Sequence, residues 1–180
     1  MADLEIHTLA NRPEALPLVA GWLYSEWGHH NPANSLATVE MGLAAELSSD
    51  ELPIQVVAVL DGAVAGTAAL KLHELRARFP TLRYWLGSVY VRPAARGRGI
   101  AGALVRHVEQ LAIDRGITAL HLQTERLDGG LYARLGFQPI EQIKHRGIDV
   151  LVMVKPLIAA ATPAAPMQSA QESAPASGAE

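Results

Sequence analysis

The stretch Arg96-Gly97-Arg98-Gly99-Ile100-Ala101 carries the strongest indication of the fold in this sequence. It follows an apolar run at residues 85–91 that is typical of a strand, and it precedes an amphipathic helical pattern at residues 101–115. A glycine-rich basic turn at a helix start exposes backbone N–H groups where the helix dipole is positive, and glycine allows close approach to the main chain. We therefore expect this turn to hold the phosphate groups of a ligand.

Composition limits the classes of protein to which the chain can belong. The 180 residues are 49% hydrophobic and carry a formal net charge of −3, which suits a folded domain without the basic surface that nucleic-acid binding needs. Cysteine is absent, so disulfides and thiolate chemistry are excluded. The N-terminus does not resemble a signal peptide and no apolar run reaches the length of a membrane span. We expect a soluble cytoplasmic protein with neither nucleic acid nor membrane as a partner.

The sequence divides into a domain at residues 1–158 and a tail at residues 159–180. The tail consists mostly of Ala, Pro, Ser, Gln and Glu. Such a segment buries too little apolar surface to offset the entropy lost on ordering, so we expect it to be disordered.

Alternating and helical patterns predict the order of elements in the domain. A first strand precedes two helices, which Asn11 and Ser35 are expected to cap. Asp61-Gly62 predicts a hairpin, and a strand, a long helix, another strand, a short helix and a closing hairpin follow. The expected strands lie at residues 4–9, 54–60, 63–72, 84–91, 117–123, 137–143 and 148–154, and the expected helices at residues 11–28, 35–47, 101–115 and 128–135. This order predicts a three-layer α+β domain with a mixed sheet.

Two motifs in this pattern resemble those of a known family. The run from Val89 to Pro93 together with Arg96, Gly99 and Ala101 resembles the acetyl-CoA signature of the GCN5-related N-acetyltransferase (GNAT) superfamily. Residues 131–137, about thirty residues further on, resemble the second motif of that family. The resemblance extends over roughly residues 6–157 and implies a GNAT-like α/β/α fold around a mostly antiparallel sheet of about seven strands.

The resemblance implies that the ligand at the glycine-rich turn is acetyl-CoA. Its pyrophosphate would lie on the N–H groups of residues 98–101, and its pantetheine arm would pair with the open edge of the preceding strand. A backbone N–H near Val91 would stabilise the oxyanion that develops on the thioester. Thr124 lies near the place where the family usually has an asparagine. The implied cofactor-binding residues are Val89, Tyr90, Val91, Arg96, Gly97, Arg98, Gly99, Ile100, Ala101, Thr124 and Tyr132.

Tyr132 is the side chain that the resemblance assigns to catalysis, because the matching tyrosine protonates the thiolate of the departing coenzyme A. No metal ion is implied. The general base stays open, because residues 85–88 contain none of the carboxylates that many family members place there. Glu74, His73, Glu125, and Ser88 acting through water are the candidates.

The acceptor is also open. The resemblance implies transfer of an acetyl group to a primary amine in a ternary complex, and Glu26 could receive that amine as a cation. A small-molecule amine and a peptide or protein N-terminus both fit, since residues near Glu26 and Tyr132 faintly resemble the actin N-terminal acetyltransferases. The protein could act as a monomer or homodimer.

Two alternatives belong to other classes of protein. The first is a noncatalytic domain that binds acetyl-CoA for regulation. The second is a dinucleotide-binding domain, because Gly97, Gly99 and Gly102 also match the G-x-G-x-x-G pattern and Glu125 follows the next strand. The hairpins before the glycine turn disfavour the dinucleotide alternative.

Overall fold

The computed structural model describes residues 3–158, so the predicted tail at residues 159–180 lies outside the described residues. Single 3₁₀ turns occur at Leu9–Asn11, Pro13–Ala15, Gly28–His30 and Pro93–Ala95. The strands are β1 (Leu4–Thr8), β2 (Ile54–Leu60), β3 (Ala63–Lys71), β4 (Trp85–Val91), β5 (Ala119–Thr124), β6 (Gln138–His145) and β7 (Ile148–Pro156). The helices are α1 (Leu16–Trp27), α2 (Leu36–Ala45), α3 (Ile100–Asp114) and α4 (Gly130–Arg134).

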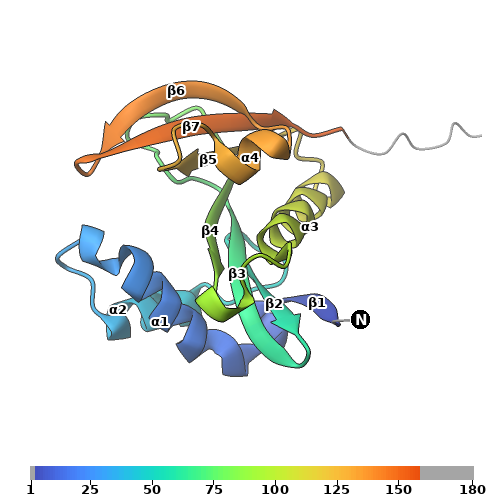
Figure 1. Cartoon of the computed structure of the whole chain (residues 1–180). Helices are drawn as coiled ribbons and strands as arrows, with labels where there is room; N and C mark the ends of the chain where they lie inside the picture. The colour runs from blue at the N-terminus through green and yellow to red at the C-terminus, as the bar shows by residue number, and fades with distance from the viewer. Residues whose placement is uncertain (1–2, 159–180) are drawn as a thin grey trace, which may run out of the picture.

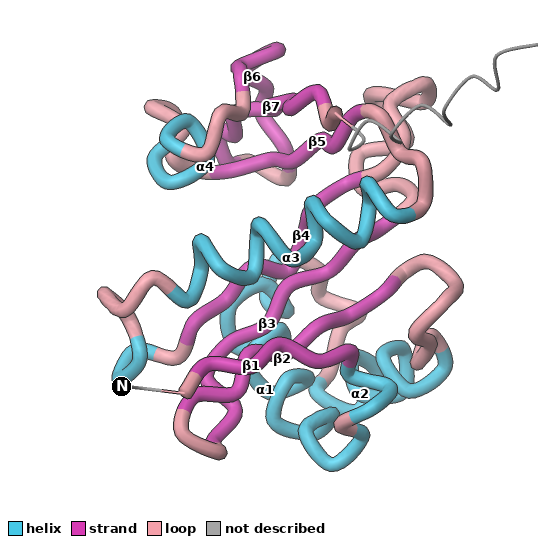
Figure 2. The backbone as a smooth tube through the Cα atoms, turned by 90° about the vertical axis from the view of Figure 1, so that its right-hand side faces the viewer, coloured by secondary structure: helices cyan, strands magenta, loops and turns pink. Residues whose placement is uncertain are grey.

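The strands form one seven-stranded sheet in the order β1-β2-β3-β4-β5-β7-β6. Every neighbouring pair is antiparallel except β4 and β5, which are parallel. Helices α1 and α2 lie on one side of the sheet and α3 lies on the other (Figures 1 and 2). The α+β fold with a mixed, mostly antiparallel sheet is therefore confirmed.

Strands β4 and β5 are joined at only one point. Trp85 pairs with His121, and the His121 N–H donates to the Tyr84 carbonyl at 2.9 Å. Beyond this pair no further register is formed between the two strands, and they separate toward the C-terminal end of β4. One edge of β4 therefore has no strand partner over most of its length.

Apolar side chains from both halves of the sheet pack against α3. Leu104, Val105 and Val108 of α3 are buried and contact side chains of β2, β3 and β4. A smaller cluster joins Val19 of α1 to Val57 on the opposite face of β2. The first cluster includes Leu86 and Val91 of β4, so the strand with the open edge is supported by the packed core.

Of the two helix caps predicted from the sequence, one is confirmed and the other is wrong. Ser35 caps α2 as expected, since its Oγ accepts the Thr38 N–H at 3.1 Å and the Thr38 hydroxyl accepts the Ser35 N–H at 2.8 Å. The prediction that Asn11 caps the first helix was wrong, because α1 begins at Leu16 after two 3₁₀ turns. A helix starting at Asn11 would have placed Pro17 in its interior, where the ring clashes with the carbonyl of Pro13.

We expect the contact between α3 and the sheet to dominate stability. Leu104→Ala should lower the free energy of unfolding by about 2–5 kcal/mol, because the side chain is fully buried and leaves a cavity. Denaturant titration measures the change. Leu36→Ala, at a position where the leucine is 45% exposed, should cost far less. Equal losses in the two variants would contradict this description of the core.

Candidate active site

The glycine-rich turn has the geometry of an anion site. Gly97 and Gly99 both have φ of +76°, and α3 begins immediately afterwards at Ile100. No side chain among the described residues caps this helix, and its first backbone bond runs from the Ala103 N–H to the Gly99 carbonyl at 3.0 Å. The N–H groups of the first turn are therefore free to bind phosphate oxygens.

The two arginines of this turn differ in their contacts. The Arg96 Nε donates to the Val91 carbonyl at 2.9 Å, and the guanidinium lies 5.8 Å from the centre of the Tyr90 ring. Arg96 thereby ties the turn to the end of β4. No hydrogen bond of the Arg98 side chain is found among the described residues, and this exposed residue adds positive charge beside the helix start.

The peptide groups of β4 alternate between the two edges of the strand. The Arg92 N–H donates to the Ala65 carbonyl at 2.9 Å, so Arg92 faces β3. Val91 must then direct its peptide groups to the opposite edge, and the bond from Arg96 to its carbonyl agrees. The same alternation places Val89 at the open edge. An extended ligand can add there as a strand would.

A cleft of about 630 Å³ lies beside the first half of β4. It is lined by five of the predicted site residues, Glu74, Ser88, Val89, Thr124 and Tyr132. Val91 and the glycine-rich turn are not part of its lining. Glu26, which could receive the acceptor amine, and Glu125, a candidate for the general base, also line this cleft. His73, another candidate for the base, lines a neighbouring cavity.

Glu74 is held in this cleft by two side chains. Its Oε1 accepts the Gln123 side-chain N–H at 2.8 Å, and its Oε2 lies 3.4 Å from the Lys71 Nζ. A Cβ at Gly87 would lie 2.8 Å from that Nζ. The Lys71–Glu74 pair therefore occupies the space that the side chain of any other residue type at position 87 would fill. The missing side chain at Gly87 thus lets a carboxylate from the β3–β4 connection reach the face of β4.

Ser88 marks an irregularity in β4. Thr67 pairs with Tyr90 and Ala69 pairs with Gly87, so Ser88 and Val89 together lie opposite Ala68. Ser88 has φ of +55°, which is unusual for a residue other than glycine and is found mostly where a bulge redirects the backbone. The bulge lies within the cleft lining, next to the open edge.

Tyr132 comes from α4 on the far side of the split. Its ring packs edge-on against Phe137 at 6.1 Å between centres, and it also lines the cleft. Burial raises the pKa of Tyr132 to about 12, and the negative charge of Glu74 contributes to this shift. The phenol is therefore protonated over the whole neutral range and can serve only as a proton donor there.

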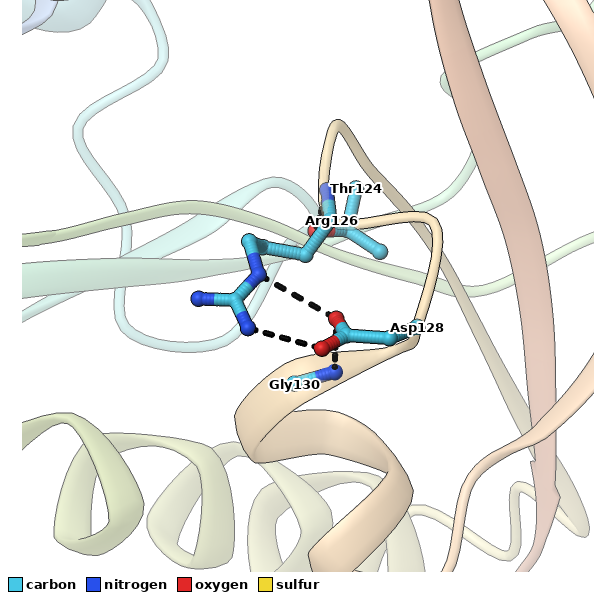
Figure 3. Close-up of polar contacts among 4 residues, drawn as sticks. All are labelled: Thr124, Arg126, Asp128 and Gly130. Atoms are coloured by element: carbon cyan, nitrogen blue, oxygen red, sulfur yellow. Dashed lines mark hydrogen bonds and ion pairs between the residues drawn. The ribbon is translucent and has the colours of Figure 1, made fainter.

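The loop between β5 and α4 is braced by its own side chains (Figure 3). The Thr124 hydroxyl accepts the Arg126 N–H at 3.1 Å, and Asp128 accepts the Gly130 N–H at 3.1 Å. Arg126 binds the same carboxylate in a bidentate manner at 3.1 and 2.8 Å, which holds the pKa of Asp128 below its usual value. These bonds fix the start of α4 and hence the position of Tyr132.

The cleft residues that the sequence analysis did not name as site candidates include Lys71, Gln123 and His145. His145 ends β6 at the hairpin where it pairs with Ile148 of β7, and both residues of this hairpin line the cleft. Burial lowers the pKa of His145, the charge of Arg146 lowers it further, and Glu74 opposes the shift. Its imidazole is therefore neutral at neutral pH. None of the three lies in a recognisable local motif, so only the sheet topology identifies them.

Comparison with known proteins assigns the family. Residues 17–137 match the model of the acetyltransferase (GNAT) family, and the chain belongs to that family. No curated protein sequence matches the chain. Membership of this family does not support the dinucleotide-binding alternative that Gly97, Gly99 and Gly102 suggest.

Solved structures share the fold at low sequence identity. An N-acetyltransferase from Staphylococcus aureus Mu50 is 14% identical with a TM-score of 0.67, over 87% of this chain and 99% of that chain. An aminoglycoside 6'-N-acetyltransferase complexed with coenzyme A is 18% identical with a TM-score of 0.64, over 86% and 97%. The yncA protein of Salmonella typhimurium, solved with its cofactor acetyl-CoA, is 19% identical with a TM-score of 0.65, over 89% and 97%.

Residues 3–158 lack two other features, a group of metal-ligating side chains and a membrane-spanning helix. That part of the chain contains no group of three or more His, Asp or Glu side chains arranged to hold a metal ion. It also contains no helix with the length and apolar character needed to cross a membrane.

The raised pKa of Tyr132 can be tested by titration. The chain has four tyrosines, and the one at position 132 should ionise near pH 12 rather than near 10. The tyrosinate absorbance of the parent protein minus that of Tyr132→Phe should show this late transition. Because burial favours the neutral phenol, Tyr132 should contribute stability below pH 10 that is lost as the pH rises to 12. A difference spectrum with its midpoint near 10 would contradict the buried position.

Proposed function

We propose that this protein is an N-acetyltransferase that transfers an acetyl group from acetyl-CoA to a primary amine in a ternary complex. The open edge of β4 carries the proposal, because it leads from the phosphate-binding geometry at Gly99 to the cleft that contains Glu74 and Tyr132. We expect the enzyme to be cytoplasmic and to need no metal ion.

The residues fit acetyl-CoA. The free N–H groups that follow Gly99 and the charge of Arg98 would hold its phosphates. The peptide groups of Val91 and Val89 would pair with its extended arm. When bound, acetyl-CoA supplies the activated acetyl group as a thioester.

The open edge of β4 supports a position for the backbone N–H that would stabilise the oxyanion. The resemblance implied an N–H near Val91, but Val89 lines the cleft and Val91 does not, so we propose the Val89 N–H in its place. The bulge at Ser88 directs the backbone just before this group. Ser88 would thereby position the oxyanion donor through the backbone.

Two side chains would move protons. Glu74 binds the incoming ammonium group and accepts a proton from it, which leaves a neutral amine as the nucleophile. Lys71 and Gln123 keep the carboxylate at this position. Tyr132 donates its phenolic proton to the departing thiolate, and the proton that the attacking nitrogen loses as the amide forms restores the phenol. His145, neutral and in the same cleft, is the competing proton acceptor.

Binding of acetyl-CoA should raise the melting temperature. At a ligand concentration of one hundred times the dissociation constant, linkage adds about 2.7 kcal/mol to the free energy of unfolding. Gly99→Ala should reduce this gain, because the new side chain strains a residue at φ of +76° and projects toward the phosphate site. NAD should give no gain.

The control for this variant is Gly62→Ala. Gly62 has φ of +80° in the β2–β3 hairpin, and a Cβ there also meets nothing within 4 Å. Both variants should lose stability without ligand, but only Gly99→Ala should lose the response to acetyl-CoA. An equal response to acetyl-CoA in the two variants would contradict the proposal that this turn binds the phosphates.

Substitution of Tyr132 and Glu74 should slow catalysis with little effect on acetyl-CoA binding. General acid or base assistance contributes about 10²–10⁴-fold, so kcat should fall by that factor in Tyr132→Phe and in Glu74→Gln. Release of coenzyme A measures the rate, and thermal shift measures binding. His145→Asn serves as the comparison for the base.

The pattern of results separates the alternatives. A full rate in Tyr132→Phe would exclude the phenol as the acid. A larger loss of kcat in His145→Asn than in Glu74→Gln would identify the imidazole of His145, and not Glu74, as the general base. A parent protein that binds acetyl-CoA and acetylates no amine would be a noncatalytic binding domain.

A further inference from the structure

Helix α2 is poorly packed for a helix of a folded domain. It packs against α1, and none of its residues is buried. Met41 is 68% exposed and Leu36 is 45% exposed. A short apolar helix usually gains its stability by burying one face, and α2 does so only in part.

A cavity of about 450 Å³ lies along one face of α2. Val39 and Leu43 line it from the helix, four residues apart on one helical face, and Leu47 lines it from the segment that follows the helix. Leu9, Pro53 and Leu72 line it from the β-sheet side. Protein interiors are normally close-packed, and a mostly apolar space of this size falls in the range of ligand pockets.

This cavity joins the catalytic cleft. Leu23, Val39, Lys71 and Ser88 line both spaces. Lys71 pairs with Glu74, and Ser88 forms the bulge of β4, so the boundary between the two spaces lies at the proposed reaction centre. A molecule whose amine lies at Glu74 can therefore extend into the cavity beneath α2.

We propose that the cavity under α2 is a subsite for the apolar body of the acceptor, which makes the acceptor a primary amine with an aliphatic or aromatic group. This inference rests on the proposed function and specifies its substrate class. Half of the lining residues are aliphatic or proline, and the apolar face that they form favours such an amine over a polyhydroxylated one. The buried His73 Nδ1, which has no partner among the described residues, offers one hydrogen bond to a polar group on that body.

The experiment compares ethylamine with n-hexylamine as acceptors at saturating acetyl-CoA. The two ammonium groups are alike, so their difference reports the apolar chain alone. Each buried methylene contributes about fourfold, and we expect kcat/KM for hexylamine to exceed that for ethylamine by at least about tenfold. Hexylamine should also raise the melting temperature of the complex with coenzyme A, and ethylamine should not.

Gly42→Leu is the variant that tests the location. Gly42 lines the cavity, and a Cβ at this position meets nothing within 4 Å, so the side chain of a leucine can start there without a backbone clash and extend into the space. Leucine also favours the helical state over glycine. The variant should lose the preference for hexylamine while acetylating ethylamine at the parent rate.

Gly21→Leu is the matched control. Gly21 lies on α1, a Cβ there also meets nothing within 4 Å, and the residue lines neither space. It should keep the preference for hexylamine. The subsite is refuted if the chain length has no effect, if Gly42→Leu keeps the preference, or if only a peptide or an aminoglycoside is acetylated.

The outcomes distinguish this inference from the function on which it rests. If the protein responds to acetyl-CoA and acetylates ethylamine and hexylamine equally, the proposed function stands and the subsite is refuted. If the protein shows no thermal response to acetyl-CoA, both the proposed function and the subsite are refuted.

Discussion

The single pairing between β4 and β5 is the constraint on which the site depends. His121 donates its backbone N–H to the Tyr84 carbonyl at 2.9 Å, and its ring Nδ1 lies 2.8 Å from the Arg83 carbonyl. The buried Trp85 ring packs beside the imidazole at 5.5 Å, and its Nε1 donates to the Leu82 carbonyl at 3.0 Å. These contacts hold the two strands together at one end of β4 and leave them free to diverge at the other.

The divergence leaves unpaired peptide groups at the edge of a central strand, which proteins normally avoid. Arg96 satisfies one of them, the Val91 carbonyl. A ligand that adds as a strand would satisfy others, and it would be led from the phosphate turn toward Glu74 and Tyr132 on either side of the gap. Under the proposed function, the same feature accounts for both the choice of ligand and the position of the two groups that we propose to transfer protons.

Much of the fold could be predicted because its signals are local. Asp61 and Gly62 both adopt positive φ, as the turn sequence predicts, and β2 has its predicted bounds. The predicted start of the first helix was wrong because proline is not tolerated in a helix interior. Pro17 is accommodated only because α1 begins at Leu16, which places the proline in the first turn.

The site was only partly predictable. Residues 96–101 and Tyr132 lie in local motifs, and the structure gives the turn its anion-binding geometry and places Tyr132 in the cleft. Lys71, Gln123 and His145 come together only through the strand order, which no local pattern contains. Glu74 could be named as one candidate among several, but its position depends on the space that Gly87 leaves on a different strand.

Hydrogen exchange of the β4 amides, measured with and without coenzyme A, tests the central claim most directly. The claim is that the ligand pairs with the open edge of this strand. Coenzyme A should slow exchange at Val89 and Val91, whose peptide groups face the split, and should leave Arg92 nearly unchanged because its N–H is already bonded to Ala65. Unchanged exchange at Val89 and Val91 in a protein saturated with coenzyme A would contradict the account.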